Sequence, residues 1–141
     1  CDFLIAAPNA SFGFPIARTL GNCLSMQNYA RLVALVGIPR VREMVMTARL
    51  LSATEAHALG LYLEVVETAA VLPRALALAA ELSKLAPLTL RATKESLRRI
   101  RSHWVPQPDD HDLVLECYLS NDFKNAVNAF LEKTPPVWQG E

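Results

Sequence analysis

The least ordinary part of the chain is the segment Phe12-Gly13-Phe14-Pro15-Ile16-Ala17-Arg18-Thr19-Leu20-Gly21-Asn22. Two glycines and a proline interrupt this segment, which predicts a loop rather than a continuous helix or strand. A loop that joins a strand to a helix is a common place for binding residues. These residues therefore indicate a pocket near positions 12 to 25.

Short apolar segments precede and enter this loop. Residues 3–7 form an apolar run that ends at Pro8 and Asn9, which predicts a buried strand followed by a turn. Residues 11–15 predict a second short extended piece. We expect an irregular stretch through Arg18, Gly21 and Asn22 to follow.

Helix signals follow the loop. Ser25 can cap a helix with apolar positions at helical spacing, Gly37 ends that helix, and Pro39 opens the next one. Ser52 and Glu55 have the spacing of a capping box at the start of a further helix. The other predicted elements are a strand over 61–66 after Gly60, helices over 71–86 and 88–101 that form a hairpin, a helix around 113–117 capped by Asp109, and a last helix over 123–131.

Strands and helices in this order predict an α/β fold, and the connections are short enough for one domain. The chain has 141 residues, of which 52% are hydrophobic, which suffices for one buried core. Fourteen acidic residues balance fourteen basic ones, so the net charge favours neither nucleic acid nor an anionic membrane. We find no membrane-spanning run or leader pattern and expect a cytoplasmic protein.

Cysteine and histidine spacings predict no metal site. Three cysteines lie far apart without a CxxC pair, which argues against a disulfide framework or a zinc site, and we expect all three to be buried apolar residues. The histidines fall in three different predicted elements, away from any nucleophile. The cluster Asp109-Asp110-His111-Asp112 is better explained as helix capping than as a metal site. The cysteines are Cys1, Cys23 and Cys117, and the histidines are His57, His103 and His111.

One predicted helix carries a basic stripe, formed by Arg91, Lys94, Arg98 and Arg101. These residues recur every three or four positions and so share one helix face. A solvated surface is the simpler interpretation, and contact with phosphate or RNA is the alternative.

Motifs along the whole chain resemble the enoyl-CoA hydratase/isomerase (crotonase) family. The resemblance begins with Cys1-Asp2 before an apolar strand and with Ala10-Ser11-Phe12-Gly13-Phe14-Pro15. It continues through Arg31-Leu32, Val36-Gly37, Thr47-Ala48-Arg49-Leu50-Leu51-Ser52-Ala53, Glu55-Ala56, Gly60-Leu61, Pro87-Leu88, Lys94-Glu95 and the segment Asp122-Phe123 to Lys133.

The resemblance implies that the chain is the C-terminal half of a crotonase. Residues 1–66 would be the last ββα turn of the family's spiral, with the active-site loop at residues 12–25, and residues 67–141 would be the helical region that builds a trimer or hexamer. The expected partners are an acyl-CoA thioester, further copies of the chain and the N-terminal half. No cofactor is expected, because CoA is part of the substrate.

The family reaction stabilises a thioester enolate with two backbone N–H donors, an oxyanion hole. The resemblance places both donors, and one of the two glutamates used by hydratases, upstream of Cys1. The second glutamate would follow the Phe-Gly-x-Pro motif, where this chain has Ile16. Because an aliphatic side chain transfers no proton, the two-glutamate mechanism cannot operate unchanged, and we expect no confident catalytic residue in this chain.

The resemblance also implies a set of substrate-binding residues. Arg18 is a candidate for positioning a carboxylate or phosphate, with a structural salt bridge as the alternative. Tyr118 lies where the family often has an aromatic residue near adenine, and Lys133 precedes a position of basic residues near the CoA phosphates. The full expected set is Phe12, Phe14, Pro15, Ile16, Arg18, Gly21, Asn22, Tyr118 and Lys133.

Two functional hypotheses follow. The first is an enoyl-CoA hydratase/isomerase family enzyme that acts on an acyl-CoA thioester, with its oxyanion segment outside this chain. The alternative is a non-catalytic assembly protein or an RNA-binding protein with the crotonase fold.

Overall fold

Helices make up most of the described chain. The computed structural model describes residues 2–104 and 109–141. Within these residues the elements are β1 (Ile5–Ala6), β2 (Ser11–Phe12), α1 (Ile16–Thr19), α2 (Met26–Met46), β3 (Leu51–Ser52), α3 (Ala53–Ala58), β4 (Glu64–Val65), the 3₁₀ helix η1 (Thr68–Ala70), α4 (Val71–Leu82), α5 (Pro87–Trp104), α6 (His111–Leu119) and α7 (Asn121–Glu132). They form two compact units, which are described separately.

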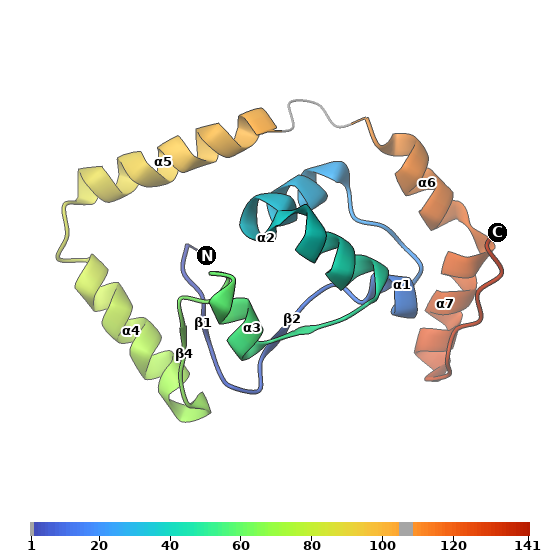
Figure 1. Ribbon diagram of the computed structural model, residues 1–141, viewed down its shortest axis with the longest axis horizontal. Helices are drawn as coiled ribbons and strands as arrows, with labels where there is room; N and C mark the ends of the chain where they lie inside the picture. Colours follow the sequence, from blue (N-terminus) through green and yellow to red (C-terminus); the bar gives the residue numbers. More distant parts are fainter. Residues whose placement is uncertain (1, 105–108) are drawn as a thin grey trace. The chain divides into compact units, whose positions relative to one another are not determined.

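The first unit contains residues 2–12 and 51–104. Strand β1 pairs in parallel with β4, and β2 pairs antiparallel with β3, so that Phe12 lies opposite Leu51. Figure 1 shows β1 beside β4, with α3 next to them. Two further backbone bonds extend the β1–β4 pair, from Leu63 N to Leu4 O and from Val66 N to Ala6 O. Segments far apart in the sequence thus meet at the start of the loop.

Helix α3 shows why this unit folds locally as the sequence predicts. Ser52 Oγ accepts a hydrogen bond from Glu55 N, and Glu55 Oε2 accepts one from Ser52 N. This reciprocal pair is the predicted capping box, and it is confirmed. The helix buries Ala53 and Ala56 completely, because only small side chains fit where it lies against the strands.

The second unit contains residues 13–50 and 109–141. Ser25 caps α2 by accepting a hydrogen bond from Asn28 N, as predicted. Gly37 interrupts α2 with φ +77°, which places the kink at the glycine that was predicted to end the helix. After the kink α2 buries Val41, Met44 and Val45.

Helix α7 ends in a chain reversal. Lys133 has φ +57°, and Thr134 N donates to Ala129 O over 2.9 Å, which closes the helix by a left-handed cap. Residues 134–141 then turn back beside α7, as Figure 1 shows for the C-terminal segment.

Several local predictions are wrong. Residues 16–19 form helix α1 rather than irregular chain, with Pro15 at its N-cap position. Cys23 and Cys117 are half-buried free thiols rather than fully buried residues, and Cys1 lies outside the described residues. Asp109 does not cap α6, because Asp110 occupies the N-cap position.

Helices α4 and α5 do not pack face to face as a hairpin; they diverge from their short connection (Figure 1). The first unit contains a cavity of about 340 Å³. The residues before β1, the end of α4 and helix α5 line it, and its apolar lining residues are Phe3, Leu82, Leu90 and Leu97. Many apolar side chains of both helices are exposed, for example Leu72, Leu76 and Leu88. The predicted division at residue 66 stays a prediction.

No helix within residues 2–104 and 109–141 has the length and hydrophobicity needed to cross a membrane.

Candidate functional site

The predicted loop is a tightly closed turn around α1. Arg18 N and Thr19 N both donate to Pro15 O, at 3.0 and 3.1 Å, and Thr19 Oγ1 donates to the same oxygen over 3.0 Å. Gly21 N donates to Ile16 O over 2.8 Å, which closes the turn. Backbone hydrogen bonds to Pro15 O and to Ile16 O therefore fix the position of Ile16 at the start of this helical turn.

Gly13 lets the loop approach residues 49–50 closely. A methyl group on Gly13 would lie 2.8 Å from Leu50 Cδ2 and 2.9 Å from Arg49 O. Because the second contact is with backbone, a larger residue could not be accommodated by a side-chain movement alone. Glycine at this position thus sets how closely the loop packs on the segment before β3.

Gly21 and Asn22 connect the other end of the loop to the C-terminal region. Gly21 has φ +67°, and a methyl group on it would lie 2.8 Å from Trp138 Cζ3. Asn22 Nδ2 donates to Tyr118 Oη over 3.0 Å. The ring of Tyr118 in turn lies 4.8 Å from that of Phe123. Three of the predicted binding residues, Gly21, Asn22 and Tyr118, are thus brought together.

One polar atom of this region is unsatisfied. Asn22 Oδ1 is buried, and it has no hydrogen-bond partner within the part of the chain that the structure describes. Buried polar atoms normally have a partner. The amide is therefore able to accept one further hydrogen bond from a donor that enters the loop.

Asn22 is followed in the sequence by Cys23, whose thiol has Cys117 as a neighbour. The Cys23 thiol donates to Leu113 O over 3.6 Å. Burial, followed by the neighbouring Cys117, raises the pKa of Cys23 to about 11. Burial likewise raises the pKa of Tyr29. The Cys23 thiol and the Tyr29 phenol therefore stay protonated at neutral pH and are poor bases and nucleophiles.

The remaining predicted residues occupy different surroundings. Phe12, Phe14, Pro15 and Ile16 are half-buried, and Arg18 is exposed at the end of α1. Lys133 is the C-cap residue of α7, whereas Tyr118 precedes that helix. The binding roles of all nine residues stay predictions.

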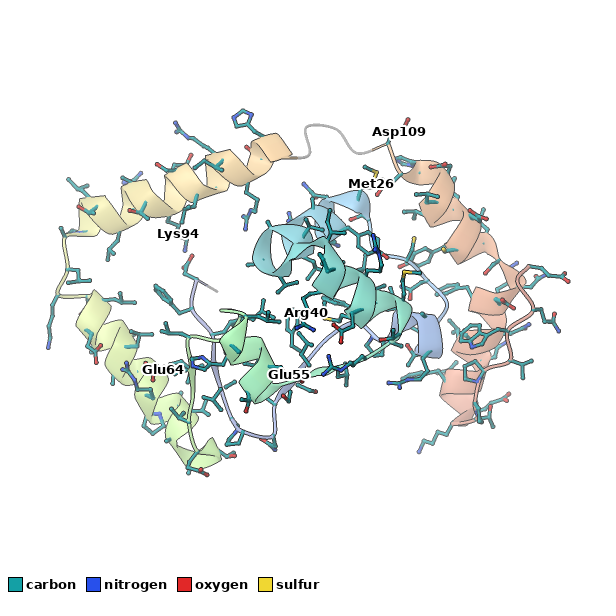
Figure 2. All side chains as sticks on the ribbon, viewed as in Figure 1. Met26, Arg40, Glu55, Glu64, Lys94 and Asp109 are labelled. Atoms are coloured by element: carbon teal, nitrogen blue, oxygen red, sulfur yellow. The ribbon has the colours of Figure 1, made fainter. Side chains whose placement is uncertain are left out.

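Asp110, predicted only as one member of a helix-capping cluster, is bonded to a different helix from the one that it precedes. Its carboxylate is buried and accepts a hydrogen bond from Met26 N over 2.5 Å, at the first residue of α2. Figure 2 shows Met26 at the start of α2 and Asp109 just ahead of α6. An acid near a helix start was the available signal, but its target helix lies 84 positions away in sequence.

The other charged clusters are ion pairs. Within the described residues, no group of three or more His, Cys, Asp or Glu side chains is arranged to hold a metal ion. In the basic stripe, Lys94 pairs with Asp2 and Arg98 pairs with Glu95, at 2.7 Å each. Figure 2 shows Lys94 on α5. These acids reduce the positive charge that the stripe presents to a phosphate.

Comparison with solved structures identifies the fold. Methylmalonyl-CoA decarboxylase in complex with 2-nitronate-propionyl-CoA aligns with a TM-score of 0.86 at 29% identity, over 99% of this chain and 55% of that chain. A carnitinyl-CoA dehydratase from Mycobacterium avium aligns with a TM-score of 0.76, also at 29% identity, over 99% of this chain and 56% of that chain. The chain therefore has the architecture of part of a crotonase fold.

Sequence comparison gives the family. The sequence profile named Enoyl-CoA hydratase/isomerase matches residues 1–141, and the chain belongs to this family. The carnitinyl-CoA dehydratase of Salmonella paratyphi A is 35% identical over 147 residues, covering 99% of this chain and 55% of that protein. The probable enoyl-CoA hydratase echA6 of Mycobacterium leprae is 35% identical over 140 residues, with the same coverage. The chain thus spans about half the length of these relatives, and the resemblance seen in the sequence is confirmed.

Proposed function

We propose that this chain is the C-terminal part of an acyl-CoA-binding enzyme that stabilises a thioester enolate. Family membership supports this proposal, and so do the CoA thioesters in the names of its relatives, carnitinyl-CoA dehydratase and methylmalonyl-CoA decarboxylase. The oxyanion donors would come from sequence outside residues 1–141. The expected chemistry is stabilisation of the negative charge that develops on the thioester oxygen.

The observation that carries the proposal is the structure of the turn at Ile16. Pro15 O and Gly21 N hold this turn closed, and Ile16 is half-buried at its start. Residues 12–25 contain no aspartate or glutamate. The loop therefore presents an apolar side chain, suited to an acyl group, and no carboxylate that could activate water.

We propose accordingly that Ile16 lines the acyl pocket and takes no part in proton transfer. Arg18, exposed at the end of α1, is proposed to position an anionic group of the substrate. The further proposal that the chain forms the last spiral turn and a trimerisation region predicts a trimer or hexamer for the full-length protein. Light scattering of that protein tests the assembly.

Calorimetric titration of the full-length protein with saturated and unsaturated acyl-CoA thioesters tests the function. We expect binding of at least one thioester, with free CoA binding more weakly because it lacks the acyl group. Ile16→Ala should weaken acyl-CoA binding by about tenfold, since it removes three carbons of apolar contact. The exposed α2 residue Met46 provides a matched control, Met46→Ala, with unchanged affinity.

The result that contradicts the proposal is the absence of binding and turnover with every thioester tested. Ile16→Glu provides a second measurement, because it places a carboxylate at the position of the family's second glutamate. If Ile16 occupies that position, this variant should alter the pH dependence of turnover, whereas Ile16→Gln should not.

A further inference from the structure

The C-terminal segment 134–140 is fixed at both ends against α7. At its beginning, the left-handed Lys133 and the bond from Thr134 N to Ala129 O reverse the chain. At its end, the carboxylate of Asp122 accepts hydrogen bonds from Gln139 N and Gly140 N, both over 2.8 Å. Charge-assisted bonds of this kind are about twice as strong as neutral ones. The segment is therefore held in one position.

This segment places Trp138 directly against the candidate loop. The indole covers the face of Gly21 on which a Cβ would stand, at 2.8 Å from Cζ3, 3.4 Å from Cη2 and 3.6 Å from Cε3. Trp138 is 40% exposed, so more than half of its surface is covered. Its neighbour Val137 is 72% exposed. Trp138 is thus the tail residue that packs on the loop, while Val137 faces solvent.

Gly21 also contacts Ile16, the first residue of α1, so it connects Trp138 with that residue. Its N–H closes the turn on Ile16 O over 2.8 Å, and its φ of +67° depends on the absence of a side chain. With the indole against it, Gly21 cannot move outward without losing that packing. Two contacts of Gly21 therefore hold the turn from residue 16 to residue 21 closed: its hydrogen bond to Ile16 O and its packing against the indole of Trp138.

We infer that Trp138 is a positioning residue that sets the size of the acyl group accepted at Ile16. The inference rests on the proposed function for its substrate, and on the tail geometry for its mechanism. Asp122 holds the tail, the tail places Trp138, and Trp138 keeps the turn at Gly21 closed. Without the indole, the turn opens and the pocket wall formed by Ile16 retreats, so that longer acyl groups fit and short ones lose contact.

Hydrogen exchange of the full-length protein tests the mechanism without any ligand. In Trp138→Ala, the Gly21 amide should exchange about tenfold faster than in the wild type, because local opening becomes easier when the packing is lost. Asp122→Ala should give the same change, since it releases the tail while leaving the indole in the chain. Val137→Ala, which truncates the exposed neighbour, should leave the exchange unchanged. Wild-type protection in both Trp138→Ala and Asp122→Ala would overturn the inference.

Turnover or binding across acyl-CoA thioesters of increasing chain length tests the specificity. Trp138→Ala should shift the preference toward longer chains by about fivefold, mainly through KM, because it changes contacts of the bound acyl group rather than the reacting atoms. An unchanged preference alongside faster exchange would overturn the specificity role. If the wild type binds no acyl-CoA, the proposed function fails, while the exchange measurement still decides whether Trp138 holds the loop.

Trp138→Phe is a control for the possibility that Trp138→Ala does not fold. Trp138→Phe retains an aromatic ring over Gly21 and should show exchange between those of the wild type and the alanine variant. If circular dichroism shows that Trp138→Ala does not fold, Trp138→Phe and Asp122→Ala carry the test. Gly21 exchange in these two variants equal to that of the wild type would then contradict the inference.

Discussion

Replacing Asp110 by alanine should lower the free energy of unfolding by about 1.5 to 2 kcal/mol. The carboxylate is buried and accepts a hydrogen bond from Met26 N over 2.5 Å. A hydrogen bond to a charged group is worth about 1.5 to 3 kcal/mol. The positive end of the α2 dipole adds about 0.3 to 1 kcal/mol. Because Met26 is 42% exposed, water replaces part of the lost bond, and the lower part of the range applies.

Urea unfolding of the full-length protein, followed by circular dichroism at one fixed protein concentration, measures this change. The midpoint should fall at an unchanged m-value, since the variant alters stability rather than the surface exposed on unfolding. Asp110→Asn keeps an oxygen acceptor but loses the charge, and it should show about half of the effect.

Asp109→Ala provides the matched control. Asp109 is the adjacent acid of the same sequence cluster, but it is exposed. Its replacement should change stability by less than about 0.5 kcal/mol. If Asp110→Ala and Asp109→Ala were equally stable, the contact with Met26 would not contribute to folding, and the stabilisation of the start of α2 by Asp110 would be refuted.

Three further predictions concern the loop and its surroundings. Gly13→Ala should destabilise the protein by about 1 to 2 kcal/mol in urea, because the new methyl group overlaps Arg49 O; equal or greater stability would contradict the close approach. Arg98, and then Arg99, lower the pKa of Glu95 to about 2, so its ion pairs stabilise the fold above the unfolded pKa. The stability difference between wild type and Glu95→Gln should vanish as pH falls from about 4.5 to 2, and a difference independent of pH would exclude this linkage. The rate of Cys23 alkylation by iodoacetamide, followed by peptide mass, should keep rising until pH is about 11, whereas a plateau above pH 9.0 would show an unperturbed thiol.

Local hydrogen bonds explain which structural predictions succeeded. The Ser25 cap and the Ser52–Glu55 capping box each join residues three positions apart. The break at Gly37 depends on the conformation of a single residue. Such features are encoded within one helical turn and can be recognised from sequence. The fold family was likewise recognisable, because its motifs extend along the whole chain.

Structural predictions failed where a side chain contacts residues far away in the sequence instead of its sequence neighbours. Asp109 was expected to cap the helix around residues 113–117, but Asp110 occupies the N-cap position of α6, and its carboxylate binds the start of α2 instead. Helices α4 and α5 were expected to form a hairpin, but they diverge from their connection (Figure 1). Helical periodicity shows which face of a helix is apolar, but it does not show which element covers that face.

The sequence by itself determined the starts of α2 and α3, the break at Gly37, the family, and the aliphatic residue Ile16. Only the tertiary structure decided that Trp138 lies on Gly21 and that Asn22 bonds to Tyr118, contacts that span 117 and 96 positions. The physical reason is that capping and periodicity depend on neighbours within a few residues, whereas these contacts depend on the path of the whole chain and on the packing that brings distant surfaces together.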